Sequence, residues 1–299
     1  YYRTMKNKLM ENIFDLSRSQ LALRLEANGF KTFNASQIFS WLYQKNELDP
    51  IAWSNISKAL KKYLFQQFQF NLPEIIWNGQ SSDGTRKFLL RFHDKNTIET
   101  VLIPARNRLT ICISSQVGCA IGCTFCHTGT MGLKRHLLPS EVVGQYLVIR
   151  NWLIENNAES KITNVVYMGQ GEPLHNFQHM KTATEIFLDD YGLSLGQRRI
   201  TLSTSGMIPQ IKKLNDFPPV NIAISLHAAH DEIRSELMPI NKVYDLKRLL
   251  CAIKEIPLKA HRWITFEYLL IKGLNDRQSD IEALAKLLPE KISKVNLIP

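Results

Sequence analysis

The stretch Gln116-Val-Gly-Cys119-Ala-Ile-Gly-Cys123-Thr-Phe-Cys126-His127 places three of the chain's five cysteines within eight residues. Thiolates crowded this closely repel one another unless a disulfide, a metal ion or a metal cluster takes up their charge. Three is an odd number for disulfides, so a metal centre is the first hypothesis.

Four kinds of site match part of this pattern. A tetrahedral zinc site needs a fourth ligand, but His127 directly after Cys126 is poorly placed to bind the same ion, and no second Cys/His pair follows at zinc-ribbon spacing. Residues 123–127 match the C-x-x-C-H haem-attachment pattern, which belongs to exported proteins, and we read no export signal here. A thioredoxin-like C-x-x-C leaves Cys119 unexplained. The fourth is a [4Fe–4S] cluster on three cysteines, with one iron open to a ligand from outside the protein.

Length and composition predict a folded protein without a membrane segment. The 299 residues suffice for one large α/β domain and a small accessory domain. A content of 44% hydrophobic and 21% charged residues excludes a disordered chain, and no apolar run reaches the length of a membrane span. Five cysteines without a secretion signal indicate metal binding or catalysis, so we expect a cytoplasmic protein.

The chain carries a net charge of +10, which suits an acidic partner such as nucleic acid and equally serves solubility alone. Residues 1–70 hold twice as many Lys and Arg as Asp and Glu. This region is either a solvated helical cap or a module that docks RNA.

Three regions of different pattern follow one another. Residues 1–70 predict helices, the first of which starts at the capping box Ser17-Arg-Ser-Gln20. Residues 71–108 alternate as short strands and predict a small antiparallel β linker. Residues 109–299 predict an α/β fold, a partial (β/α)6 TIM-like barrel that binds ligands at the C-terminal ends of its strands. Its expected strands are 110–115, 164–168, 199–203, 221–225, 263–270 and 294–298.

Polar residues stand at the ends of these strands. After the second strand comes Met168-Gly-Gln-Gly171-Glu172-Pro173, whose glycines let the backbone approach a ligand while the carboxylate can accept from an ammonium group. Alone, each such motif fits a turn or a structural residue. Gathered at one edge of the sheet, they predict an active site. The further members are Ser203, Ser225-Leu226-His227 and Asn296.

The spacing C-x3-C-x2-C, with an aromatic residue before the last cysteine, resembles that of radical S-adenosylmethionine (SAM) enzymes. Over nearly the whole chain from about residue 11, the sequence is similar to the RlmN/Cfr family of radical SAM RNA methyltransferases, more to its RlmN branch than to its Cfr branch. The motifs that carry this likeness lie at 112–119, 169–174, 198–206, 225–227, 238–241 and 295–299.

The resemblance implies a [4Fe–4S] cluster on Cys119, Cys123 and Cys126, with two SAM molecules used per turnover. It implies methylation of adenosine C2 in the peptidyl-transferase centre of 23S rRNA and in the tRNA anticodon loop. The Cfr branch instead methylates C8 of the rRNA adenosine. Implied partners are 23S rRNA, tRNA and an external electron donor such as flavodoxin, with the chain acting as a monomer. The non-enzymatic alternative is a zinc-containing RNA-binding module.

The resemblance also implies roles for single residues. Glu99 takes the position of the acceptor of the C2 proton, although a carboxylate on an alternating strand would by default face solvent. Cys112 would form a disulfide with a methyl-bearing cysteine to release product, although a thiol on an apolar strand is by default buried and inert. Cys251 is expected in the core. The implied SAM contacts are Gly171, Glu172, Ser203, Ser225, Leu226, His227 and Asn296.

In the family, the methyl-bearing cysteine lies beyond the position of Pro299, and this sequence shows no counterpart. We therefore expect cluster assembly and SAM binding from these 299 residues, but no methyl transfer.

Overall fold

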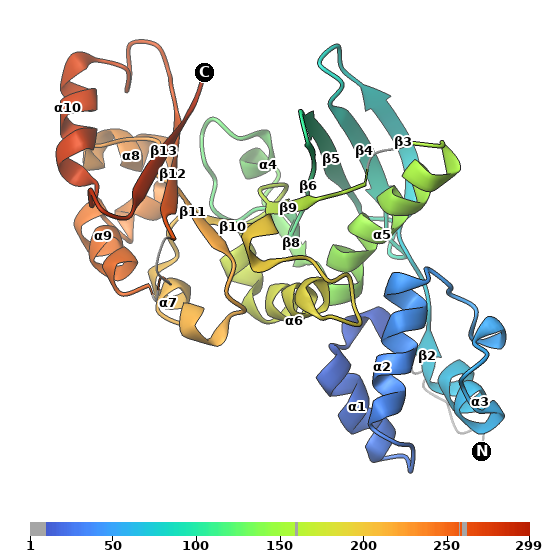
Figure 1. Cartoon of the computed structure of the whole chain (residues 1–299). Coiled ribbons are helices and arrows are strands. Elements are labelled where there is room, and N and C mark those ends of the chain that lie inside the picture. The colour runs from blue at the N-terminus through green and yellow to red at the C-terminus, as the bar shows by residue number, and fades with distance from the viewer. Residues whose placement is uncertain (1–9, 159–160, 257, 259–261) are drawn as a thin grey trace, which may run out of the picture.

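A computed structural model describes residues 10–158, 161–256, 258 and 262–299, and its centre is a nine-stranded sheet ordered β13-β12-β11-β10-β9-β6-β5-β4-β3 (Figure 1). Six neighbouring strands of this sheet are parallel. The predicted α/β class and partial barrel are thereby confirmed. These strands are β6 Arg108–Cys112, β9 Asn164–Tyr167, β10 Ile200–Thr204, β11 Asn221–Ser225, β12 Ile264–Leu269 and β13 Ser293–Ile298.

Helices follow the parallel strands and cover one face of the sheet. The side chain of Tyr167 on β9 points to this helix-covered face, because its hydroxyl forms a hydrogen bond with Thr184 of α6 at 2.9 Å. The sequence predicts helices over 140–156, 180–190, 209–214, 245–256 and 280–288, and the observed helices begin and end within a few residues of these bounds. A further helix, α8 Asp231–Leu237, was not predicted. The others are α5 Pro139–Glu155, α6 Phe177–Leu188, α7 Ile208–Ile211, α9 Leu246–Lys254 and α10 Gln278–Leu287.

The predicted β linker forms three antiparallel strands, β3 Glu74–Gln80, β4 Arg86–Arg91 and β5 Thr97–Ala105. It is not a separate sheet, because β5 also pairs with β6 and Val101 lies opposite Cys112. An unpaired edge at β6 would leave its backbone N–H and C=O groups open, and β5 satisfies them. The linker thus extends the barrel sheet.

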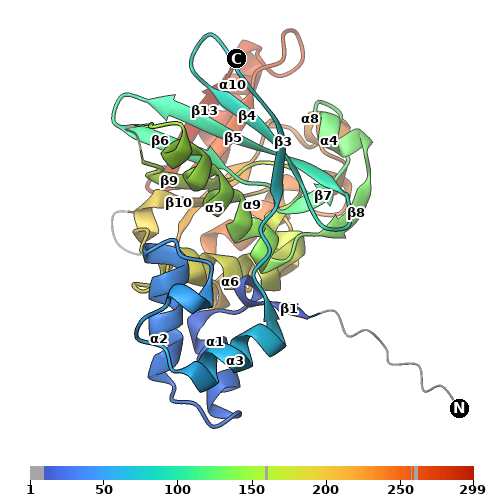
Figure 2. The ribbon, with the colours of Figure 1, turned by 90° about the vertical axis from the view of Figure 1, so that its right-hand side faces the viewer.

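The N-terminal region is a small helical bundle that lies beside the sheet (Figure 2). It contains α1 Arg18–Glu26, α2 Phe33–Phe39 and α3 Lys58–Gln67, and the short strands β1 Glu11–Asn12 and β2 Phe68–Gln69 pair across it. The predicted capping box is present, since Ser17 and Gln20 exchange side-chain and backbone hydrogen bonds. An ion pair of 2.8 Å between Arg18 and Asp189 joins the bundle to the barrel. Residues 1–9 of the predicted domain lie outside the described residues.

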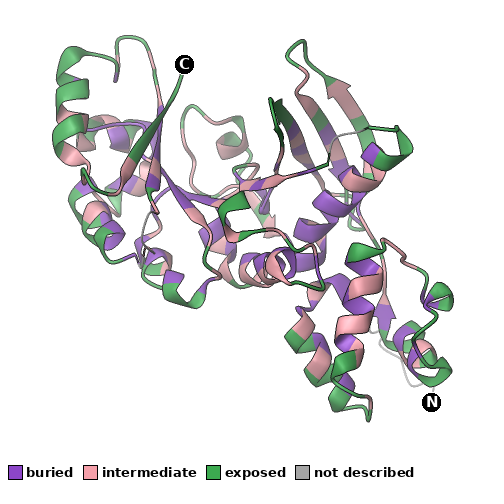
Figure 3. Cartoon of the chain, viewed as in Figure 1, coloured by how far each residue is buried: buried purple, intermediate pink, exposed green. Residues whose placement is uncertain are grey.

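The core of the barrel lies between the middle strands of the sheet and the helices that cover them (Figure 3). Ile111, Val165 and Leu202, on three neighbouring strands, are fully buried there. Apolar area removed from water is the main stabilising contribution to such a core, at about 25 cal/mol per Å². Within the described ranges, no helix is both long and apolar enough to span a membrane.

A buried amide fixes the point where the sheet leads into the cysteine stretch. Gln145 of α5 accepts from Thr100 Oγ1 at 2.8 Å and from the Ser114 backbone amide at 2.9 Å. Its Nε2 donates to the Ser114 carbonyl at 3.0 Å. All three residues are buried, so these polar groups find partners in the protein rather than in water. The amide therefore sets how the chain leaves β6.

We expect Gln145→Met to lower the free energy of unfolding by about 1–3 kcal/mol, because the Ser114 amide and the Thr100 hydroxyl stay buried without a partner. Urea unfolding followed by circular dichroism measures this change. Gln66→Met, at an exposed position on α3, is the matched control and should unfold like the parent. Equal stability of all three proteins would contradict the assigned role.

Candidate active site

The cysteine loop leaves a short hairpin formed by β7 Gln116–Gly118 and β8 Leu133–His136. Gly118 has φ +78°, and a Cβ there would lie 1.8 Å from the Gly132 carbonyl oxygen, so only glycine fits. That same carbonyl accepts from the Cys119 backbone amide at 3.0 Å. The hairpin therefore fixes where the first cysteine enters the loop.

The three loop cysteines line one cavity of about 440 Å³ at the C-terminal ends of the parallel strands. The predicted strand-end residues Gly171, Glu172, Ser203, Ser225 and His227 line the same cavity. The structure thus brings together the loop after β6 and the ends of β9, β10 and β11. Other lining residues are Ile121, Phe125, Thr128, Tyr167, Met168, Gly169, Pro173, Thr204, Ser205, Met238, Glu267, Leu269 and Ile298.

The electrostatics of the loop favour a positively charged metal centre. Burial raises the pKa of Cys119, and burial together with Cys119, Cys126 and Glu172 raises the pKa of Cys123 to about 12. Thiolates held here therefore need a cation beside them. All five cysteines of the chain are free thiols, so Cys112 forms no disulfide.

The donor set suits a cluster better than a single ion. Within the described ranges, no group of three or more His, Cys, Asp or Glu forms a site that could hold a metal ion. A zinc ion needs its ligands about 2 Å from one point. In a cubane cluster each cysteine binds a different iron, so Cys119, Cys123 and Cys126 need not converge on one point. Three thiols lining one cavity fit this requirement.

The loop after β9 presents Glu172 to the cavity. Gly171 has φ +97°, and a Cβ there would lie 2.5 Å from the Gln116 side chain. The Glu172 carboxylate is buried and accepts from the Ser205 amide and hydroxyl, each at 2.7 Å, and from the Leu174 amide at 3.0 Å. Burial raises the pKa of Glu172, and the bonds from Ser205 oppose that shift. The carboxylate is thereby held in one orientation at the cavity wall.

His227 is strained and buried, and it is held as a neutral ring. Its φ of +60° lies in the left-handed region, which is uncommon for a residue other than glycine. Its Nδ1 accepts from the Leu269 amide at 3.0 Å, so its proton sits on Nε2. Burial, with a contribution from Arg234, lowers the pKa of His227 to about 4. Its ring packs edge-on against Phe125 with centroids 4.9 Å apart.

Strand register brings Ser225, Glu267 and Asn296 side by side, since they are consecutive partners on β11, β12 and β13. Asn296 Nδ2 donates to Glu267 Oε2 at 2.6 Å. Asn296 and Leu226 do not line the cavity; Leu226 is buried, and its backbone amide donates to the Glu267 carbonyl at 3.0 Å. Sequence reasoning missed Glu267, although a lone carboxylate within the apolar run 264–269 was a usable signal.

Glu99 and Cys112 lie outside the cavity lining but on the sheet face that bears it. Thr100 on β5 points to α5, so its neighbours Glu99 and Val101 point to the opposite face of the sheet. Cys112 on β6 is the partner of Val101 and therefore points to that opposite face as well. Burial raises the pKa of Cys112 to about 11. Glu99 pairs with Lys87 at 3.1 Å and is 44% exposed. Glu99 and Cys112 therefore share the sheet face opposite α5, and neither lines the cavity.

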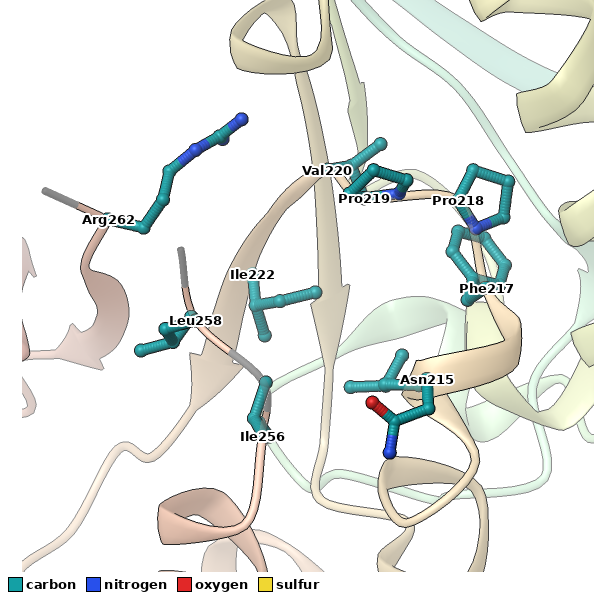
Figure 4. Close-up of a pocket in the computed structure, with 10 residues that line it drawn as sticks. Asn215, Phe217, Pro218, Pro219, Val220, Ile222, Ile256, Leu258 and Arg262 are labelled. Atoms are coloured by element: carbon teal, nitrogen blue, oxygen red, sulfur yellow. The ribbon is translucent and has the colours of Figure 1, made fainter. Parts of the chain in front are cut away.

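Two further features differ from what the sequence suggested. Cys251, expected in the core, is exposed on α9, because the buried face of that helix is formed by Leu249, Ala252 and Ile253. A second cavity, of about 390 Å³, lies at the opposite, N-terminal ends of the parallel strands, where β11 starts (Figure 4). Its walls include Phe217, and none of the predicted site residues lines it.

Comparisons with known proteins agree with this geometry. The family model described as the radical SAM superfamily matches residues 113–288, and that of the ribosomal RNA large subunit methyltransferase N-terminal domain matches residues 11–69. The dual-specificity RNA methyltransferase RlmN of Rhodospirillum rubrum is 43% identical over 98% of this chain and 70% of its own length. The corresponding protein of Paramagnetospirillum magneticum is 44% identical over 96% of this chain and 65% of its own length. The chain belongs to the RlmN family of the radical SAM superfamily.

A solved relative supports the family assignment at the level of the fold. The crystal structure of a radical SAM methyltransferase from Sphaerobacter thermophilus matches with a TM-score of 0.86 and 39% identity, over 97% of this chain and 85% of that one. This RlmN-family chain is therefore an enzyme of the radical SAM class, and membership of that superfamily implies a [4Fe–4S] cluster and SAM. It spans about two thirds of the length of the two bacterial relatives above.

The neutral state of His227 predicts a pH effect on stability. The pKa of His227 is about 4 in the folded chain and 6.5 as the ordinary value, so between these pH values the unfolded chain binds more protons. Stability is therefore expected to fall as the pH drops through this window, by roughly 3 kcal/mol in total. Urea unfolding of the iron-free protein between pH 7 and 4 measures it.

His227→Asn keeps a residue that tolerates the left-handed region and should flatten this pH dependence. His93→Asn, at an exposed position, should retain the parent's slope. If the unfolding free energy of His227→Asn depended on pH as steeply as that of the parent, the His227 ring would not be the cause of the pH dependence.

Proposed function

We propose that this chain is the radical SAM part of an RNA methyltransferase that methylates C2 of adenosine in 23S rRNA and in tRNA. The observation that carries the proposal is the single cavity shared by three cysteines and the strand-end residues Glu172, Ser203 and His227. Relatives named as dual-specificity RNA methyltransferases support the choice of substrate.

Cys119, Cys123 and Cys126 would hold a [4Fe–4S] cluster, which when bound supplies the electron that starts radical chemistry on SAM. The remaining cavity wall suits SAM itself. Glu172 offers a carboxylate to its ammonium group, Ser203 a hydroxyl to its carboxylate or ribose, and the His227 ring an aromatic face to its adenine. Apolar side chains such as Ile121 and Leu269 exclude water from the same space.

The chemistry of adenine explains why such a site is needed. The C2 carbon is electron-poor and its hydrogen is not acidic, so C2 has no lone pair or carbanion that could attack a methyl sulfonium. A radical route avoids this obstacle, and a base must finally remove the C2 proton. Glu99 is our candidate for that base, because it lies on the sheet face that bears the cavity and is partly exposed.

The proposal includes the partners. RNA would dock on the basic helical region, whose residues 11–69 match a ribosomal RNA methyltransferase domain. An external one-electron donor such as flavodoxin would reduce the cluster, and two SAM molecules would be used per turnover. We propose that the enzyme works as a monomer in the cytoplasm.

Deletion of the gene that encodes this chain is expected to remove 2-methyladenosine from both 23S rRNA and tRNA, measured by mass spectrometry of digested RNA. Complementation with a gene carrying Cys123→Ala should fail to restore it, because one ligand of the cluster is lost. Cys251→Ala, at an exposed position outside the cavity, is the matched control and should restore it. Loss of 8-methyladenosine instead would support the Cfr-type reaction, and unchanged RNA would refute both.

Glu99→Gln in the complementing gene should lower 2-methyladenosine about 100-fold or more, because a general base is removed. Reductive formation of 5′-deoxyadenosine by the purified variant should persist, since this carboxylate does not line the cavity. Glu74→Gln is the control, because it removes a comparable exposed ion pair with Arg91 on the same extension of the sheet. Full methylation by Glu99→Gln would exclude Glu99 as the base.

A further inference from the structure

Arg234, on the unpredicted helix α8, is completely buried behind the cavity. Each of its three guanidinium nitrogens donates to the protein. Nε donates to the Leu226 carbonyl at 3.1 Å, Nη1 to Asn241 Oδ1 at 2.8 Å, and Nη2 to the carbonyls of Ser205 and Ser225 at 2.8 and 3.2 Å. One side chain therefore ties together the chain segments that follow β10 and β11.

All of these acceptors are neutral. Among the ion pairs of the described residues, none includes Arg234. Asp231, one turn earlier on α8, uses its Oδ1 to accept from Asn241 at 2.8 Å and from the Leu246 amide at 2.9 Å. A buried cation without an adjacent anion is costly, so such a residue calls for a counter-charge.

The cysteine loop is attached to the end of the same helix and can supply such a counter-charge when its thiols are ionised. The Thr124 backbone amide, between two of the cysteines, donates to the Leu237 carbonyl at the end of α8 at 2.9 Å. Met238, directly after α8, lines the cavity with Cys123. Burial lowers the pKa of Arg234 to about 10, and the charges of Cys123 and Asp231 act in the opposite direction. Helix α8 thus holds a fixed positive charge against the loop that carries the thiols.

We propose that Arg234 is a positioning residue whose buried charge compensates the thiolates of the cysteine loop and raises the reduction potential of the cluster they hold. This inference rests on the cluster named in the proposed function. One-electron reduction by the external donor would add one negative charge to a cluster held by these thiols, and a buried cation on the adjoining helix would stabilise that reduced state. Because all of its nitrogens are engaged by carbonyl and amide oxygens, Arg234 acts on the cluster from behind the cavity wall and is not free to bind SAM.

The guanidinium also explains why this residue is arginine. Its planar fork donates along several fixed directions at once, so it can bond Leu226, Ser205 and Asn241 from one point. A lysine at this position keeps the charge but cannot make all of these bonds. The two properties of Arg234, charge and geometry, can therefore be separated by mutation.

The test is an anaerobic redox titration of the iron-loaded chain, with the reduced cluster followed by electron paramagnetic resonance. Arg234→Gln should shift the reduction potential to a more negative value, because the charge is lost. Arg234→Lys should stay near the parent potential while losing thermal stability, because it keeps the charge and loses the fork. Arg248→Gln, at an exposed position on α9, is the matched control and should change neither quantity.

A second variant covers the case in which both Arg234 variants fail to fold. Asp231→Asn is nearly isosteric, and its amide oxygen can still accept from Asn241 and the Leu246 amide. Removal of this carboxylate leaves the charge of Arg234 less compensated, so the potential should shift to a more positive value. Potentials that do not move with charge in the folded variants, including an unchanged Asp231→Asn, would overturn the inference.

The same experiment separates this inference from the proposed function. Suppose that the parent chain binds four irons per monomer and cleaves SAM on reduction, but that the reduction potential of the cluster is the same in the Arg234 and Asp231 variants. Only the role of Arg234 then fails. If the parent chain assembles no cluster, the proposed function fails first, and the inference about Arg234 falls with it.

Discussion

The site depends on a hydrogen-bonded link between the cysteine loop and the loop that carries Glu172. Gln116 Oε1 accepts from the Glu172 backbone amide at 2.8 Å, and its Nε2 lies 2.9 Å from His136 Nδ1. A backbone amide can only donate, so this contact fixes the orientation of the Gln116 amide and makes His136 Nδ1 an acceptor. Burial, with His175 and His179 nearby, lowers the pKa of His136, which favours this neutral ring. The two loops therefore move together or break the hydrogen bond between Gln116 and Glu172.

Polar bonds of this kind do what apolar packing cannot. Burial of apolar side chains stabilises the barrel but is not directional. Hydrogen bonds inside the protein specify both distance and angle, and an unsatisfied partner is costly. Gln145 at the exit of β6 and Arg234 behind β10 and β11 each bond several backbone groups, and Gln116 bonds the Glu172 backbone amide and the His136 ring. The strands form the framework of the barrel, and these three side chains fix the positions of the loops at the ends of the strands.

The sequence was informative where a local pattern has one structural solution. The short run 221–225, with Ile222 and Ile224, predicted a buried strand, and the spacing of Cys119, Cys123 and Cys126 indicated the cluster loop. It was uninformative where position depends on distant partners. Residues 231–237 are mostly polar, so nothing local marks them as a helix whose Arg234 is buried. The pairing of β5 with β6 likewise depends on which strand is left unpaired at the edge of the assembled sheet. The apolar run 249–253 does not reveal that Cys251 within it faces solvent.

The charges of the cavity and of the whole chain have opposite signs, and this separation follows from chemistry. Among the described residues that line the cavity are Glu172, Glu267 and three thiols, but no Lys or Arg. Such a space attracts cations, and iron, a sulfonium and an ammonium group are all positive. The chain as a whole carries +10, which attracts the phosphates of RNA to its surface. A cationic residue inside the cavity would compete with both iron and SAM for the same anions. Arg234 avoids that competition, because it is buried behind the wall with every nitrogen already bonded.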